Sequence, residues 1–336
     1  MLMAMHAPDG FLEPPVAVVT AFISVMFLAV ALRRASSELD DRQVPLAGIS
    51  AAFIFAAQMV NFPVAAGTTG HLLGGALAAI LLGPWVGCLV VAVVIVVQAL
   101  LFADGGVTAL GYNVVNMAIV PAFAGWALYL LFRKLMPRSS TGVVGAAGLA
   151  CGTSVVLAAT AFSLEWLFGA SAPVPFDTVF AAMVGTHALI GIGEGVLSAL
   201  VIAAVLASRP DLVTGARDLT PDELGDRRPV SGRAFAVGGV LVAVFFAVVV
   251  SQFAFDDPDG LERVAEDKGF IHAAQDHLIS ASPFADYATA GVRNQQLSLA
   301  IAGLAGVLVT LLVGYGLARA GTAVRVSPDR RVSEPA

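Results

Sequence analysis

The sequence predicts an all-α, polytopic membrane protein in which a seven-helix bundle precedes a C-terminal two-helix hairpin. Hydrophobic residues make up 58% of the chain and charged residues 12%, whereas soluble domains contain roughly 45–50% and 25%. The apolar residues gather into long runs, and the basic residues gather between alternate runs. This distribution excludes an ordinary cytosolic globule.

The apolar runs have the length of membrane-spanning helices, since about 20 apolar residues cross the hydrocarbon. They cover 14–32, 45–62, 72–101, 109–132, 143–168, 178–207, 234–251 and 298–318. The third run contains Gly83-Pro84, and proline interrupts a helix because it lacks an N–H and clashes with the preceding turn. We therefore expect 72–101 to form two helices, which gives nine in total.

The placement of basic residues supports nine helices. With the N-terminus outside, 15 of the 18 Lys and Arg residues fall on the inner side, within 33–42, 133–138, 209–233 and 319–331. The other three, Arg263, Lys268 and Arg293, share one outer loop. A single helix over 72–101 would invert every later loop, so the positive-inside rule favours nine helices in the cell membrane and a cytoplasmic C-terminus.

This topology divides the chain into four segments. Residues 5–207 form the seven-helix membrane component, and 208–233 form a polar cytoplasmic linker rich in Asp, Arg and Pro. Residues 234–318 form a two-helix auxiliary module with a long acidic outer loop over 252–297. Residues 319–336 form a cytoplasmic tail.

Two histidines are expected at the same outer end of this apolar chain. His6 follows Met5 in MHAPDGF, and His71 lies in the polar segment GTTGHLLGG. Imidazoles suit zinc, copper, iron, nickel or cobalt, whereas magnesium would require carboxylates. The same residues also fit a simpler interpretation, in which His6 belongs to a frayed terminus and His71 is a hydrogen-bonded loop residue.

A chain that began at Met5 would offer further nitrogen ligands. Its free amine, the His6 amide nitrogen and the His6 ring would form one chelate. His71 would complete a plane of four nitrogens, a geometry that favours Ni(II) or Cu(II). Met1–Ala4 place a peptide bond where this chelate needs an amine, so we expect translation to begin at Met5.

Four segments in order carry a resemblance to a known family. MHAPDGFLEP, GTTGHLLGGALAAILLGPWVG, LFADGGVTALGYNVVNMAIV and HALIGIGEGVLSALV resemble the substrate-binding membrane component of energy-coupling-factor cobalt and nickel importers, the CbiM/NikM type. The resemblance covers roughly 5–207. It implies that the N-terminus tucks into the bundle and that Met5, His6 and His71 bind the metal. Met1–Ala4 depart from the family pattern, which bears only on the amine ligand.

Polar residues within the apolar runs have two interpretations. Asn113 and Asn116 share a helical face. Their amides either hold the N-terminal loop around the metal or form hydrogen bonds between helices. His187 and Glu194 also lie roughly on one face, and we expect them to form a structural polar contact away from the metal.

The C-terminal module contains DDPDGLERVAEDKGF at 256–270 and SPFADYA at 282–288. These segments resemble the PDGLE-type auxiliary subunit (CbiN/NikN type) of the same importers, which implies a fused two-helix subunit with an outer loop. Its first acidic residues either collect cations weakly or form a solvated turn and helix start, and the Pro-Asp-Gly sequence favours the second interpretation. These residues are Asp256, Asp257, Asp259 and Glu262.

The expected function is import of Co²⁺ or Ni²⁺, which are transported substrates, to supply cobalamin synthesis or nickel enzymes. The chain has only two lysines, Lys134 and Lys268, and neither follows the glycine stretch of a Walker A loop. The resemblance therefore implies separate cytoplasmic ATPase subunits and a transmembrane coupling subunit. We expect no cofactor, no catalytic residue and no nucleic-acid partner.

Two other functions remain open from the residues alone. The first is an ion-coupled secondary metal transporter acting alone, with Glu165 and Glu194 as its buried charges. The second is a membrane metalloenzyme with an open metal position, for which Asp9 and Glu13 are the nearby carboxylates.

Overall fold

The structure, a computed structural model, describes residues 6–65, 67–224 and 229–326. The helices up to the linker are α1 (Pro14–Glu38), α2 (Val44–Gln58), α3 (Gly75–Leu82), α4 (Pro84–Val97), α5 (Leu110–Asn113), α6 (Val120–Arg133), α7 (Ser140–Gly169) and α8 (Phe176–Ser208). The later ones are α9 (Pro221–Leu224), α10 (Gly232–Val248), α11 (Gly260–Lys268) and α12 (Gln295–Val326). Strands β1 (Phe62–Ala65) and β2 (Thr68–Gly70) form an antiparallel hairpin before α3.

The predicted all-α membrane class is confirmed. Within the described ranges, seven helices are long and apolar enough to cross a membrane. They are α1, α4 with the π-helical turn Gln98–Phe102, α5 and α6 joined by the π-helical turn Val114–Ile119, α7, α8, α10 and α12. α2 and α3 are shorter, because the chain leaves the helix at Gln58 for the hairpin and does not re-enter one until Gly75.

The run 72–101 divides where the sequence predicted. Gly83 has φ +89°, a conformation that glycine adopts without a steric penalty, and Pro84 begins α4. A Cβ on Gly87 would lie 2.5 Å from the backbone nitrogen of Ala79. The backbones of α3 and α4 therefore pack closely after the turn, and every residue of α3 is buried.

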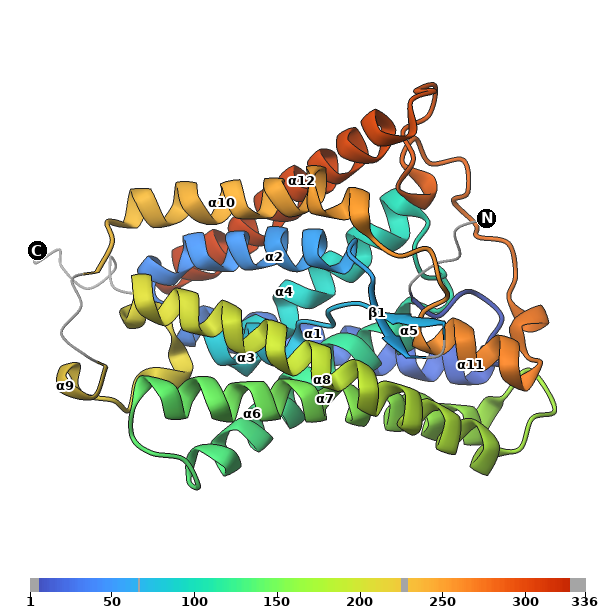
Figure 1. Cartoon of the computed structure of the whole chain (residues 1–336), viewed down its shortest axis with the longest axis horizontal. Helices are drawn as coiled ribbons and strands as arrows, with labels where there is room; N and C mark the ends of the chain where they lie inside the picture. The colour runs from blue at the N-terminus through green and yellow to red at the C-terminus, as the bar shows by residue number, and fades with distance from the viewer. Residues whose placement is uncertain (1–5, 66, 225–228, 327–336) are drawn as a thin grey trace, which may run out of the picture.

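The C-terminal hairpin packs along one side of the bundle. Figure 1 shows α10 and α12 beside α2, with α6 and α7 on the opposite side of the molecule and α8 next to α7. A side chain on Gly306 of α12 would overlap the ring of Phe55 in α2. The absence of a side chain at this position lets the two modules approach closely, as small residues commonly do between membrane helices.

The described part of the linker docks on one end of the bundle. Gln43 donates from Nε2 to the carbonyl of Leu212 at 3.1 Å, and the Tyr129 hydroxyl donates to the carbonyl of Gly215. Arg133 pairs with Asp218 at 3.2 Å. This end carries α9 and lies opposite the end that carries β1 and α11 (Figure 1). The end that carries β1 and α11 holds the candidate site.

Candidate metal centre

Asp9 fixes the loop that carries His6. Its carboxylate accepts hydrogen bonds from the backbone N–H groups of Val107, Thr108 and Ala109, at 3.2, 2.6 and 3.2 Å. The Thr108 hydroxyl donates to the same group. Hydrogen bonds to an ionised carboxylate are stronger than neutral ones, so Asp9 anchors the N-terminal loop to the segment that leads into α5.

Two glycines allow the N-terminal loop to lie this close. A Cβ on Gly106 would be 2.2 Å from the backbone nitrogen of Asp9. A Cβ on Gly105, which has φ +80°, would be 2.7 Å from the Cβ of His6. Gly106 also donates from its N–H to the carbonyl of Ala7 at 3.1 Å. Glycines are therefore required in the DGG sequence at 104–106, because the N-terminal loop packs directly against its backbone.

Asn113 and Asn116 contact different parts of the molecule. Asn113 donates from Nδ2 to the carbonyl of Ala7 at 3.0 Å, so it does hold the N-terminal loop. Asn116 donates instead to the carboxylate of Glu165 at 2.7 Å, a bond between helices. Asn113 therefore has the loop-holding role and Asn116 forms a hydrogen bond between helices. The expectation that Asn116 also holds the N-terminal loop is wrong. The Tyr112 hydroxyl, which the sequence did not single out, donates to the carbonyl of Pro8 at 2.8 Å.

His71 lies between the hairpin and α3, in a segment held on both sides. Glu194 of α8 accepts hydrogen bonds from the backbone N–H groups of Leu73 and Gly74, at 2.7 and 3.0 Å. Gln58 of α2 donates to the carbonyl of Leu73 at 3.0 Å. Glu194 was expected to contact His187, and this expectation is wrong. Nδ1 of His187 instead lies 2.8 Å from the carbonyl oxygen of Met183, one helical turn earlier.

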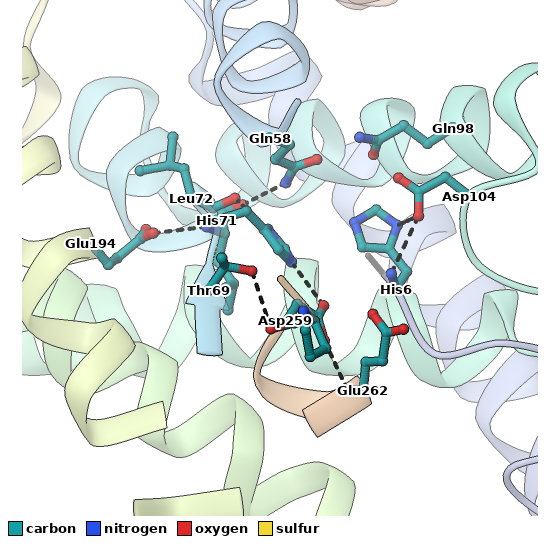
Figure 2. A network of polar contacts seen from close by, with 12 residues as sticks. His6, Gln58, Thr69, His71, Leu72, Gln98, Asp104, Glu194, Asp259 and Glu262 are labelled. Atoms are coloured by element: carbon teal, nitrogen blue, oxygen red, sulfur yellow. Dashed lines mark hydrogen bonds and ion pairs between the residues drawn. The ribbon is translucent and has the colours of Figure 1, made fainter. Parts of the chain in front are cut away.

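The fold brings His6 and His71 together. Their ring centroids are 5.7 Å apart in an edge-to-face arrangement, and both side chains are buried. Figure 2 shows the two rings facing one another from different elements. Met5, the third expected ligand, lies outside the described residues. In the part of the chain that the structure describes, no three His, Cys, Asp or Glu side chains are placed to hold a metal ion by themselves.

The ring of His6 has no hydrogen-bond partner on either nitrogen among the described residues. The Asp104 carboxylate lies 3.8 Å from its Nδ1, and the same carboxylate accepts a hydrogen bond from the His6 backbone N–H at 3.3 Å. Burial lowers the pKa of His6. The neutral ring therefore keeps a free lone pair, which is the form that binds a metal.

Asp259 of the auxiliary module lies against His71. Its Oδ2 is 3.7 Å from Nε2 of the ring. Burial opposes the charged form of His71, but the adjacent Asp259 carboxylate outweighs it and raises the pKa to about 9. Asp259 is itself buried and caps α11 by accepting from the N–H of Glu262 at 2.8 Å. The helix start predicted at Pro258-Asp259-Gly260 is present, but Asp259 is not solvated.

Backbone contacts hold Asp259 in this position. The N–H of Thr69 donates to the carbonyl of Pro258 at 2.9 Å, and its hydroxyl donates to the carbonyl of Asp257 at 2.8 Å. The second module is therefore attached to β2, two residues before His71. Asp104 and Asp259 were both missed as neighbours of the histidines, although each lies in a segment that carried the family resemblance.

Chemically, the described residues supply two imidazoles with a carboxylate beside each. Nitrogen donors of this kind suit borderline divalent ions such as nickel and cobalt, and carboxylates beside the imidazoles favour the approach of a cation. The arrangement lies at one end of the bundle, the end that carries β1 and α11 (Figure 1).

Similarity to known protein families extends along nearly the whole chain. Residues 6–212 match the family described as cobalt uptake substrate-specific transmembrane region, and residues 233–322 match the PDGLE domain. A putative fused nickel transport protein NikMN of Archaeoglobus fulgidus is 34% identical over 318 residues, which are 94% of this chain and 98% of the relative. The fused nickel transport protein NikMN of Rhodobacter capsulatus is 32% identical over 93% of this chain and 96% of the relative.

The first module also has relatives without the second. A putative metal transport protein of Haloquadratum walsbyi is 43% identical over 209 residues, which are 62% of this chain and 93% of the relative. A crystal structure described as a transition metal transporter is 32% identical and has a TM-score of 0.53. That likeness covers 60% of this chain and 92% of the solved one.

Proposed function

The chain belongs to the family of cobalt uptake substrate-specific transmembrane regions, and from this premise we propose that it captures and imports divalent nickel or cobalt. It acts as the substrate-binding component of an ATP-driven energy-coupling-factor importer. In a chain whose translation begins at Met5, the metal is held by the amine of Met5, by His6 and by His71. The imported ion supplies cobalamin synthesis or nickel enzymes.

The observation that carries this proposal is the meeting of His6 and His71 in a buried site with centroids 5.7 Å apart. Among the described residues, neither ring nitrogen of the buried His6 has a hydrogen-bond partner, which costs free energy unless a ligand compensates. A metal ion supplies that compensation. The Asp9 and Asn113 contacts support this ligand set, because they hold the loop that follows His6. We propose that an amine and an amide nitrogen from the N-terminal backbone complete the set.

Of the two ions, we favour nickel. A plane of four nitrogens is the geometry that Ni(II) prefers. The two fused relatives that span nearly the whole chain are named as nickel transport proteins.

The direction of transport is from the histidine end to the linker end. The described loops at the α9 end, within 33–42, 133–138 and 209–224, carry most of the described basic residues together with the end of α12. Such loops remain in the cytoplasm. The N-terminus is therefore outside, and the linker faces the cytoplasmic ATPases. Both Glu194 oxygens are engaged by backbone N–H groups and Glu165 is bonded to Asn116. These engagements favour ATP-driven partners over an ion-coupled transporter acting alone.

The test is metal content of the detergent-purified full chain, measured by plasma mass spectrometry after incubation with nickel and cobalt together. We expect about one ion per chain, with nickel in excess, and loss of the ion in His71→Ala. His272→Ala, an exposed histidine of the auxiliary module, is the matched control and retains the metal. A wild-type chain that binds neither ion would refute the proposed function.

The transport step is tested in vesicles that contain the chain with or without its coupling and ATPase subunits. Uptake that requires ATP and the partners supports the importer. Uptake by the chain alone that collapses with an uncoupler would replace it with ion-coupled transport.

A further inference from the structure

A cavity of about 310 Å³ lies between the N-terminal loop and the auxiliary module. Its lining runs from the exposed residues Asp276 and Asp286 of the module inward to the buried residues His6 and Asp259. The cavity therefore connects the surface of the molecule with the candidate metal site. Most of its wall belongs to the auxiliary module, although the proposed metal ligands all lie in the first module.

The described lining of this cavity is strongly acidic. Five carboxylate residues contribute to it and no lysine or arginine does. They are Asp9, Asp259, Glu262, Asp276 and Asp286. Asp9 is occupied by the amides of the α5 segment, but the side chains of Glu262 and Asp286 make no ion pair with a basic residue that the structure describes. His277, the other histidine of the wall, contacts the carbonyl of Gly105 at 3.1 Å.

A second feature is that the cavity reaches a side chain that can bind a metal. The His6 side chain is almost completely buried, both ring nitrogens lack a hydrogen-bond partner among the described residues, and the residue lines the cavity. Figure 2 shows the carboxylate of Glu262 pointing toward the space between Asp259 and His6. An acidic wall thus ends at an unsatisfied metal-binding group.

The size of the cavity matches a hydrated ion rather than a bare one. A water molecule occupies about 30 Å³ of liquid, so six waters around a divalent cation require roughly 180 Å³. The cavity contains this volume. Carboxylates that contact the waters of such an ion attract it without replacing its hydration shell, because their charge acts over several ångströms.

We propose that this cavity is an outer vestibule, in which Glu262 and Asp286 of the auxiliary module hold a hydrated divalent cation before His6 and His71 bind it. This inference rests on the proposed function and deepens it, since it assigns the auxiliary module a binding site on the way to the metal centre. The vestibule raises the local concentration of the cation and accelerates its association. It leaves the final ligands unchanged.

The test is the rate of nickel binding to the full chain. Metal-free protein is mixed rapidly with Ni²⁺, and the decrease in free nickel is followed with a chromogenic indicator. The solution is kept at pH 8, because burial and the neighbouring Asp259 raise the pKa of Glu262 to about 7. In the double variant Glu262→Gln/Asp286→Asn we expect the association rate constant to fall about fivefold at physiological salt, with stoichiometry and dissociation rate unchanged.

The matched control is Asp256→Asn/Asp267→Asn, which removes two exposed carboxylates of the same module outside the cavity wall. Its association rate constant should change by less than about twofold, since exposed charges are screened within about 8 Å. At about 1 M salt the difference between the two double variants should disappear.

Equal association rates in the vestibule variant and the control would overturn the vestibule while leaving nickel binding by the wild type intact. Faster dissociation in the vestibule variant would also overturn it, because it would make these carboxylates part of the final site. A wild-type chain that does not bind nickel would instead refute the proposed function.

Discussion

Nε2 of His71 lies 3.7 Å from Oδ2 of Asp259, so a carboxylate of the auxiliary module reaches an imidazole of the bundle. Both residues are buried. Since the pKa of His71 is raised to about 9, the ring carries a proton at neutral pH. The pair therefore couples the second module to the charge of the metal-free site.

Replacement of Asp259 should change the number of protons released when metal binds. A metal must displace the Nε2 proton, so below pH 9 the wild type should release about one additional proton per ion. In Asp259→Asn the pKa falls toward 6.5, and at pH 8 this release should vanish. Calorimetry of nickel binding in buffers of different ionisation enthalpy measures the difference. Equal proton release by both proteins would contradict the coupling.

The same pair predicts how its contribution to stability depends on pH. A histidine whose pKa is raised from 6.5 to about 9 stabilises the folded chain fully below 6.5. This contribution is lost as pH rises through 9. Limited proteolysis of the metal-free protein should therefore cut the 256–270 segment faster at pH 9.5 than at pH 7.5, relative to cleavage of Asp259→Asn. A pH response that Asp259→Asn shares would exclude this pair as the cause.

Replacement of Asn113 and of Asn116 should have different effects on the affinity for nickel. Asn113 contacts the carbonyl of Ala7, whereas Asn116 contacts Glu165. Loss of one hydrogen bond that orders the N-terminal loop costs about 1 kcal/mol, so Asn113→Ala should weaken nickel binding roughly fivefold. Asn116→Ala should leave the affinity unchanged. Equilibrium dialysis of both variants tests this, and equal weakening would show that helix packing rather than the loop contact matters.

Glu194 should stabilise the segment that follows His71. Glu194→Ala leaves the N–H groups of Leu73 and Gly74 buried without an acceptor, which costs roughly 1–3 kcal/mol for each group. Glu194→Gln keeps one carbonyl oxygen and should be intermediate. The buried thiols of Cys88 and Cys151 report unfolding through a thiol-reactive dye. The alanine variant should react at a lower temperature than wild type, and an unchanged midpoint would remove the role given to Glu194.

A side chain on Gly106 should displace the N-terminal loop. A Cβ there would lie 2.2 Å from the nitrogen of Asp9, while a Cβ on Gly185 of α8 meets nothing within 4 Å. We expect Gly106→Ala to lose nickel binding, measured by metal content, and Gly185→Ala to retain it. Retention by both would show that the loop shifts without disturbing His6.

Of the nine predicted membrane helices, seven are long and apolar enough to cross a membrane in the described part of the chain. These seven were predictable because burial in lipid leaves a strong pattern in composition. The division at Gly83-Pro84 was predictable because backbone sterics alone require it. The partner of Glu194 was not, since a seven-residue spacing places it on a face with His187 but says nothing of the adjacent α3 segment. The neighbours of the two histidines were also hidden. Asp104 and Asp259 reach them only through contacts between distant segments, which a single sequence does not specify.

The presence of both modules in one polypeptide fixes the ratio of the two modules at one to one. α8 continues into α10 through a linker in which the carbonyls of Leu212 and Gly215 accept hydrogen bonds from Gln43 and Tyr129 of the bundle. The segment bearing Asp259 is therefore tethered to the bundle that carries His71. A short tether gives an effective concentration of about the millimolar range. A tethered auxiliary segment therefore binds its own bundle in preference to that of another chain. Dilution in the membrane or scarce synthesis of a separate subunit would not leave the site uncovered.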